Sequence, residues 1–157
     1  MTLAIHTPAG LRTVKQEDRL VELLRERAPD VEYMRTSRSG DRAKAAVDAV
    51  LVRAGEVIGV AESKCRNITR EEMRKSFDNE WLITAKKMFD CRAAGVLLQV
   101  PTFGLLYCVK DDSLVIVKLF DEDGESCRPM RFERTLTQAT VNGGQAFRTN
   151  GYVEIGE

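Results

Sequence analysis

Three charged side chains in one short stretch have the types and spacing for metal-dependent chemistry. Asp48 interrupts an apolar run rich in β-branched residues, and Glu62 and Lys64 follow a second apolar run. Gly55 lies between the runs and can adopt the positive φ of a tight turn, so residues 45–66 predict a β-hairpin. Each charge alone could be a solvated strand end. Together they indicate a shared site, because a buried carboxylate without a partner is costly.

The length of the hairpin loop decides whether these side chains meet, because side chains alternate between the two faces of a strand. We expect a three-residue loop, 53–55, with Gly55 in the left-handed position. This register pairs Asp48 with Val60 and makes Asp48 and Glu62 diagonal neighbours on one face, roughly 7 to 8 Å apart at the backbone. A two-residue loop would separate the two carboxylates unless a bulge intervened.

The composition favours one domain spanning 1–157 without a global charge. The 157 residues include 24 basic and 24 acidic ones, so any contact with nucleic acid must use local patches. The four cysteines are widely spaced and His6 is the only histidine, which argues against structural zinc and against Ser/His/Asp catalysis. Without a signal peptide or a long apolar run, we expect no membrane contact and a cytoplasmic protein with reduced thiols.

A helix predicted over 14–28 carries an acid where an apolar residue is expected. Leu20, Val21 and Leu24 form its apolar stripe, and Glu17 precedes them by three, four and seven residues. Glu17 therefore lies on the inward face of the helix, where it could belong to the site at the hairpin. Alternatively, it is a first-turn acid that the helix dipole stabilises. Both interpretations remain open at this point.

A strand predicted over 31–36 leads into a polar, glycine-containing loop that reaches the hairpin. The segment brings four cations, Arg35, Arg38, Arg42 and Lys44, close to one loop acid. Such a loop can follow phosphates, and the alternative is a solvated connection.

Beyond the hairpin, Thr69 and Glu72 form a capping box that starts a helical segment to about residue 94, with a break possible near 78–79. Lys86 lies partly on its inward face and could reach a phosphate or cover apolar surface with its stem, whereas Lys87 is expected to face solvent. A buried strand follows Gly95.

A second hairpin is expected over 105–120, and from residue 121 the chain becomes polar. We expect residues 121–157 to form a C-terminal extension of short strands, with a turn at 142–144. The core of the domain would then span about 13–120.

The order of these features, an acidic helix, a strand, a basic loop, a D…ExK hairpin, a helix and a strand, resembles the PD-(D/E)XK nuclease superfamily, also called restriction-endonuclease-like. The resemblance covers roughly residues 13–100. The stretches QEDRLVELLRE, TSRSGDRAKAAVDAVLV and VIGVAESKCR look most like archaeal-type Holliday-junction resolvases and phage nucleases. Val47 stands where the motif has its proline, a position that supplies no ligand.

The resemblance implies an α/β fold with an αβββαβ core, in which helices flank a mixed central sheet and extra C-terminal β-strands follow. It also implies a DNA endonuclease that uses Mg²⁺, for which Mn²⁺ can substitute. Asp48, Glu62, the Ser63 carbonyl and Glu17 would surround the metal, and Lys64 would orient the attacking water. Contacts with DNA are expected from Arg35, Arg38, Arg42, Lys44, Arg66 and Lys86. A homodimer is plausible, and the alternative function is a nuclease-fold DNA-binding or assembly module that does not cleave.

Overall fold

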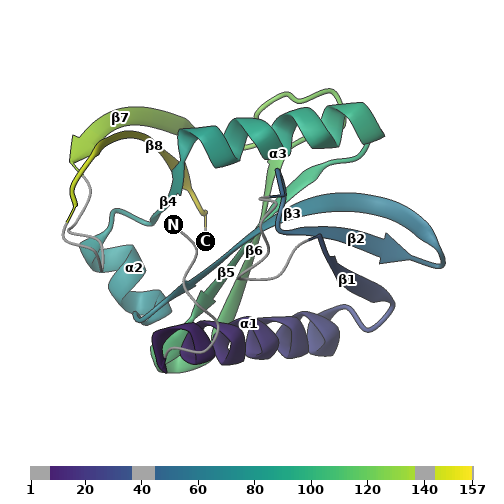
Figure 1. The fold of residues 1–157 in the computed structure, drawn as a ribbon, viewed down its shortest axis with the longest axis horizontal. Coiled ribbons are helices and arrows are strands. Elements are labelled where there is room, and N and C mark those ends of the chain that lie inside the picture. Colours follow the sequence, from purple (N-terminus) through teal and green to yellow (C-terminus); the bar gives the residue numbers. More distant parts are fainter. Residues whose placement is uncertain (1–7, 37–44, 137–143, 157) are drawn as a thin grey trace.

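The computed structural model describes residues 8–36, 45–136 and 144–156 and shows an α/β fold (Figure 1). The elements in chain order are α1 (Pro8–Arg27), β1 (Val31–Arg35), β2 (Ala49–Arg53), β3 (Glu56–Arg66), α2 (Arg70–Ser76), β4 (Glu80–Thr84), α3 (Ala85–Leu98), β5 (Thr102–Cys108), the 3-10 turn η1 (Val109–Asp111), β6 (Ser113–Phe120), β7 (Met130–Leu136) and β8 (Phe147–Glu154).

A mixed five-stranded sheet in the order β1-β2-β3-β5-β6 forms the centre of the molecule. Only β3 and β5 run parallel, and the chain between them contains α2, β4 and α3. Figure 1 shows α1 and α3 on opposite sides of this sheet. Leu20 and Leu24 of α1 pack against Ala61 on one face, and Cys91 of α3 packs against Val60 on the other. Strand alternation therefore places Glu62 and Lys64 of β3 on the α3 side.

The hairpin between β2 and β3 differs from the predicted one in its loop. Arg53 pairs with Glu56, so the loop has two residues, Ala54 and Gly55, with φ angles of 50° and 81°. Two residues with positive φ are typical of the tight turn that matches the twist of a hairpin. The prediction of a three-residue loop is therefore wrong.

A β-bulge compensates for the shorter loop. Val52 pairs with Val57 and Leu51 with Gly59, so Ile58 is an extra residue on β3. Beyond the bulge the backbone N–H of Asp48 donates to the carbonyl of Ala61, 3.1 Å away. Asp48 thus precedes β2 and lies opposite Glu62. The predicted pairing of Asp48 with Val60 is wrong, because Val60 pairs with Val50, but the expected common face of the two acids is present.

The long helix predicted after the capping box is divided into two helices and a strand. The capping box at Thr69 is present, but Asp78 and Asn79 have positive φ and end the first helical segment. Residues 80–84 then form β4, in which Trp81 and Ile83 are buried and their neighbours are not. α3 continues to Leu98, so the strand expected after Gly95 is helical, and β5 begins only at Thr102.

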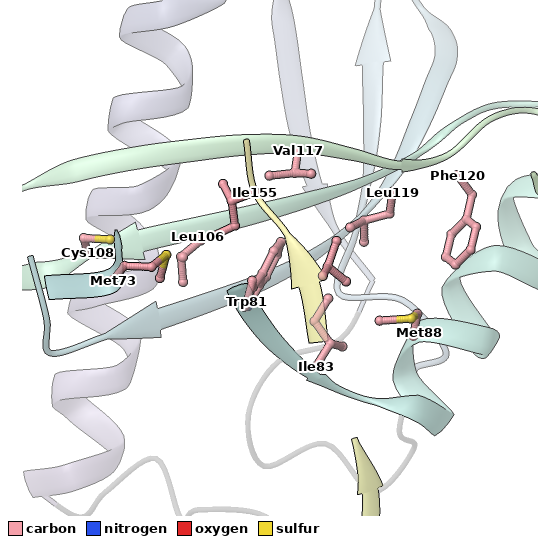
Figure 2. Packing of buried hydrophobic residues seen from close by; sticks show 11 residues of the cluster. Met73, Trp81, Ile83, Met88, Leu106, Cys108, Val117, Leu119, Phe120 and Ile155 are labelled. Carbon is pink, nitrogen blue, oxygen red and sulfur yellow. The ribbon is translucent and has the colours of Figure 1, made fainter. Parts of the chain in front are cut away.

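The C-terminal strands join β4 in a second sheet of order β4-β8-β7. The turn expected at 142–144 involves residues 142 and 143, which lie outside the described residues. Trp81 anchors the second sheet to the first, because it packs directly over Gly104 of β5. Figure 2 shows Trp81 in the buried cluster to which both sheets contribute. A Cβ atom on Gly104 would lie 1.7 Å from Cζ3 of Trp81, so only glycine permits this approach.

Two further observations bear on the sequence predictions. No helix in the described part of the chain is long and apolar enough to cross a membrane. The cysteines at positions 65, 91, 108 and 127 are free thiols, and those of Cys91 and Cys108 are buried.

Candidate active site

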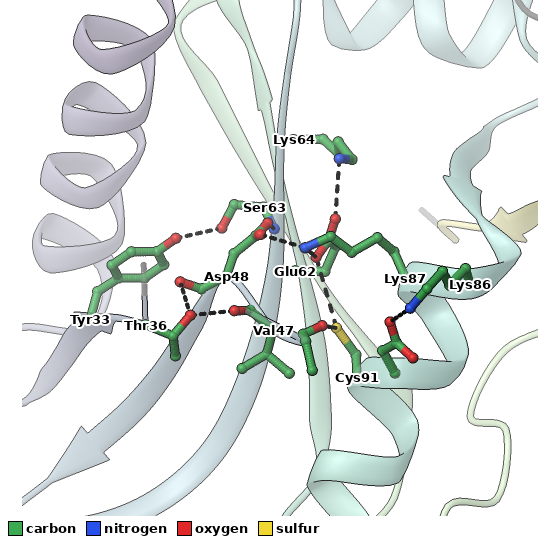
Figure 3. Close-up of polar contacts among 12 residues, drawn as sticks. Tyr33, Thr36, Val47, Asp48, Glu62, Ser63, Lys64, Lys86, Lys87 and Cys91 are labelled. Carbon is green, nitrogen blue, oxygen red and sulfur yellow. Dashed lines mark hydrogen bonds and ion pairs between the residues drawn. The ribbon is translucent and has the colours of Figure 1, made fainter. Parts of the chain in front are cut away.

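Asp48, Glu62 and Lys64 lie together where the β2–β3 hairpin faces the start of α3 (Figure 3). Nζ of Lys64 lies 3.1 Å from Oε1 of Glu62. The backbone N–H of Ser63 donates to Oδ2 of Asp48 at 2.9 Å, which orients that carboxylate. The side chain of Ser63 points the other way and bonds to the hydroxyl of Tyr33, 2.8 Å away. The structure therefore brings together the three charges of the predicted motif.

Lys87 is a fourth charged member of this cluster, and the sequence analysis placed it in solvent. Its Nζ lies 3.0 Å from Oδ1 of Asp48 and 3.5 Å from Oε2 of Glu62 (Figure 3). Lys86, which was expected to face inward, is instead 83% exposed and pairs with Asp90. The assignment of these two lysines was therefore reversed.

The reversal follows from where the helix begins. The apolar period was extended through residues that form β4, whereas α3 starts afresh at Ala85 and buries Ala85, Met88, Cys91 and Gly95. Lys87 precedes Cys91 by four residues and so lies on the same side of the helix. The spacing of Lys87, Cys91 and Gly95 was the signal in the sequence that could have identified it.

Glu62 is a fully buried acid in an environment that is only partly neutralised. Burial raises the pKa of Glu62, and the Asp48 charge raises it further, while Lys64 and Lys87 oppose both effects. Oε1 of Glu62 accepts no hydrogen bond of normal geometry despite its ion pair with Lys64. Oε2 receives a weak contact from the thiol of Cys91 at 3.8 Å. The environment therefore favours additional positive charge at this carboxylate.

The two carboxylates in turn stabilise the charged form of Lys87. Burial alone would lower the pKa of Lys87, but the charges of Glu62 and Asp48 outweigh burial and raise it. Lys87 is therefore held as an ammonium ion between one oxygen of each acid. These two oxygens converge on a position that a small cation could occupy.

The donor set at this position matches a hard divalent cation. Asp48 and Glu62 offer carboxylate oxygens, the ligands that Mg²⁺ prefers together with retained waters. Within residues 8–36, 45–136 and 144–156, no cluster of three or more potential ligand side chains is found. A metal held here would therefore take two side-chain carboxylates and complete its coordination with other oxygen atoms.

Glu17 lies near the cluster but approaches from α1, on the other side of the sheet. Its Oε1 is 3.4 Å from Nε of Arg35, and Nη2 of the same arginine donates to Oδ1 of Asp18 at 2.7 Å. Burial raises the pKa of Glu17, Arg35 opposes this effect, and the charge of Asp48 adds to it. Glu17 thus senses the Asp48 charge without joining its ion-pair cluster.

The predicted DNA-contacting cations lie in several different places. Arg35 is occupied by the two acids of α1, and Arg66 is exposed, with a long contact of 3.5 Å to the carbonyl of Leu82. Partial desolvation lowers the pKa of Arg66. Arg38, Arg42 and Lys44 lie outside the described residues. The structure therefore places none of the described arginines within the carboxylate cluster.

Comparison of the chain with protein-family models, with curated proteins and with solved structures finds no significant match. The chemistry of the cluster is therefore inferred from its own residues and contacts.

Proposed function

We propose that the protein is a metal-dependent nuclease that hydrolyses DNA phosphodiester bonds, with Asp48, Glu62 and Lys64 in its active site. The observation that carries this proposal is the convergence of one oxygen of Asp48 and one of Glu62 on a single cation, the ammonium of Lys87. Lys64 lies at the other oxygen of Glu62. Two acids and an adjacent lysine are the groups that phosphodiester hydrolysis by metal-activated water requires.

The order of the elements gives independent support. Without the α2–β4 unit, the chain from α1 to β5 follows the order α1-β1-β2-β3-α3-β5, with β3 and β5 parallel. This order is compatible with the αβββαβ core that the resemblance to restriction-endonuclease-like proteins implies. The strands after β5 then extend the core, and residues 121–157 add two of the three strands of the second sheet.

Each residue of the cluster has a distinct part in the proposed reaction. Asp48 and Glu62 would hold Mg²⁺ or Mn²⁺, and the bound ion supplies Lewis-acid activation of water and of a phosphate oxygen. The N–H of Ser63 keeps the Asp48 carboxylate in its orientation. Lys64 would orient the attacking water and stabilise the extra negative charge of the transition state. Glu17 would contribute through water, because it lies outside the ion-pair cluster.

DNA is the proposed partner of the protein, and the cytoplasm is its proposed location. An endonuclease that cuts both strands of a duplex commonly uses two active sites, so a homodimer is part of the proposal. The alternative function is a nuclease-fold module that binds DNA without cutting it. The complete set of Asp48, Glu62 and Lys64 favours the enzyme over this alternative.

A cleavage assay tests the proposal directly. Linear, branched and single-stranded DNA are incubated with the protein in Mg²⁺, in Mn²⁺ and in EDTA. We expect metal-dependent cutting that falls at least about 100-fold in Asp48→Ala, which removes a proposed metal ligand, and in Lys64→Ala, which removes the proposed stabiliser of the transition state. Lys75→Ala is the matched control, since Lys75 forms an exposed ion pair on α2. Absence of cutting by the wild type on every substrate, or full activity of Asp48→Ala, would show that the protein is not this enzyme.

A further inference from the structure

Three phenylalanine rings are exposed on α3 and on the β7–β8 hairpin, and the proposed mechanism gives none of them a role. Phe89 of α3 and Phe132 of β7 are 50% and 48% exposed, and their rings stack with centroids 5.5 Å apart and planes 17° apart. Phe147 of β8 is 62% exposed, and the guanidinium of Arg134 lies 5.2 Å from the centre of its ring. We call Phe89, Phe132, Arg134 and Phe147 the aromatic surface.

The register of β7 and β8 places Phe132, Arg134 and Phe147 on one face of the hairpin. Phe132 pairs with Gly151, Arg134 with Thr149 and Leu136 with Phe147, so positions 132, 134, 136, 147, 149 and 151 share a face. Gly151 leaves the space that Phe132 and α3 occupy, because a Cβ atom there would lie 2.5 Å from Cε of Met88 and 3.2 Å from the Phe132 ring. The aromatic surface is thus built by the packing of the hairpin against α3.

The same helix connects the aromatic surface to the candidate active site. Lys87 contacts Asp48 and Glu62, and Phe89 follows it by two residues on the other side of α3. A helix with its side chains is about 10–12 Å across, so the two sites lie within a few nucleotides of one another along a strand. In Figure 1, β7 and β8 lie beside the end of α3 that follows β4, which is the end that carries Lys87. A strand that leaves the carboxylates across this end of α3 would meet the aromatic surface.

The charge of the aromatic surface suits a polyanion. Arg134 forms no ion pair with a carboxylate of the described chain, in contrast to Arg131, which pairs with Glu80 and Glu133. Glu133 lies on the opposite face, because it alternates with Phe132 and Arg134 along β7. Exposed aromatic rings interleaved with an arginine guanidinium are the features with which proteins bind single-stranded nucleic acid by stacking and phosphate contact.

We infer that the aromatic surface binds a single strand of DNA that extends from the carboxylate site. Bases stack on Phe132 and Phe147, and Arg134 contacts a phosphate. This inference rests on the proposed function, since it identifies single-stranded or frayed DNA as the form that the same site accepts.

Binding measured in EDTA separates this inference from catalysis. Fluorescence anisotropy of a labelled 20-nucleotide dT oligomer is recorded with the wild type, Phe132→Ala, Phe147→Ala and Arg134→Gln. We expect each phenylalanine variant to lose roughly 5- to 150-fold in affinity, the range for one lost stacking contact. Arg134→Gln should weaken binding and reduce the salt dependence by about one released counterion. Leu97→Ala, an exposed position near the other end of α3, is the matched control and should bind like the wild type.

Phe147→Trp provides a test that does not depend on a loss of function. A tryptophan keeps the stacking platform, so this variant should bind the oligomer at least as tightly as the wild type, with quenching of its fluorescence. Unchanged affinity in both Phe132→Ala and Phe147→Ala would overturn the inference. A second outcome would also overturn it: the wild type is a dimer, and Phe147→Ala is a monomer that binds the dT strand with unchanged affinity. The aromatic surface would then join two copies of the chain. If the variants lose binding but the wild type never cleaves, the inference stands and the proposed nuclease activity fails.

Discussion

Replacing Lys87 with methionine should make the candidate site bind divalent metal more tightly. The ammonium of Lys87 occupies the position on which the oxygens of Asp48 and Glu62 converge, at 3.0 and 3.5 Å. A metal ion that uses the same two oxygens must displace this internal cation. Methionine keeps much of the apolar stem of the side chain and removes the competing charge.

The size of the effect follows from the geometry of the ion pair. Opposite unit charges about 4 Å apart attract by about 4 kcal/mol at an effective dielectric constant of 20. Solvent screens this pair, because the side chains of Lys87 and Asp48 are 32% and 28% exposed, and we reduce the contribution to about 1–2 kcal/mol. The affinity of Lys87→Met for Mg²⁺ or Mn²⁺ should therefore be roughly 5- to 30-fold higher than that of the wild type.

Isothermal titration calorimetry with Mn²⁺ and Mg²⁺ measures this affinity without any substrate. Lys86→Met is the control, since Lys86 carries the same charge on the preceding residue but faces solvent. A second readout is thermal stability, which should fall in Lys87→Met in EDTA, where the two carboxylates repel each other, and recover when metal is added. Equal or weaker metal affinity in Lys87→Met than in the wild type would refute the assignment of Lys87 as an internal counter-cation.

Three further predictions concern stability. Burial raises the pKa of Glu17 above its ordinary value of 4.5. In urea unfolding, Glu17→Gln should therefore match the wild type in unfolding free energy at pH 4 and exceed it increasingly as the pH rises from 4.5 through the raised pKa. A higher unfolding free energy of the wild type at pH 7 would contradict this. Gly104→Ala should lose about 3 kcal/mol or more by the same assay, because its Cβ would overlap the ring of Trp81, and wild-type stability would show that the strand can move away. Ala54→Gly should gain about 0.5–1 kcal/mol, because Ala54 has a φ of 50°, and a lower melting temperature would contradict the turn geometry.

The sequence predicted the charged hairpin because the pattern there is local. The alternation of apolar residues and the position of Gly55 identify two strands, and the acids follow or interrupt their apolar runs. The predicted loop length was wrong because no sequence pattern identifies the bulge at Ile58. A two-residue loop with positive φ and one extra residue on β3 place Asp48 and Glu62 on a common face, as the predicted three-residue loop would have done. The common face of Asp48 and Glu62 thus followed from a register that differs by one residue at the turn.

The region after the hairpin was less predictable because its secondary structure depends on distant partners. Residues 80–84 are apolar enough for a helix or a strand, and they form β4 because β8, about seventy residues later in the chain, pairs with them. This misassignment moved the start of α3 and exchanged the inferred positions of Lys86 and Lys87. Lys87 was therefore not predicted as a member of the site, because its position depends on the pairing of β4 with β8, which no local stretch of sequence reveals.

The environment of Glu62 bears on the choice between the two proposed functions. A buried carboxylate with a raised pKa lowers the stability of the folded chain near neutral pH, and buried ion pairs seldom return the cost of their desolvation. A module that only binds DNA through its surface has no use for such a group, and a neutral isostere at this position would be more stable. An enzyme that must concentrate negative charge around a metal requires it. Glu62→Gln should therefore raise the melting temperature at pH 8 in EDTA while it removes metal binding, and a loss of stability in this variant would favour a structural role for the acid.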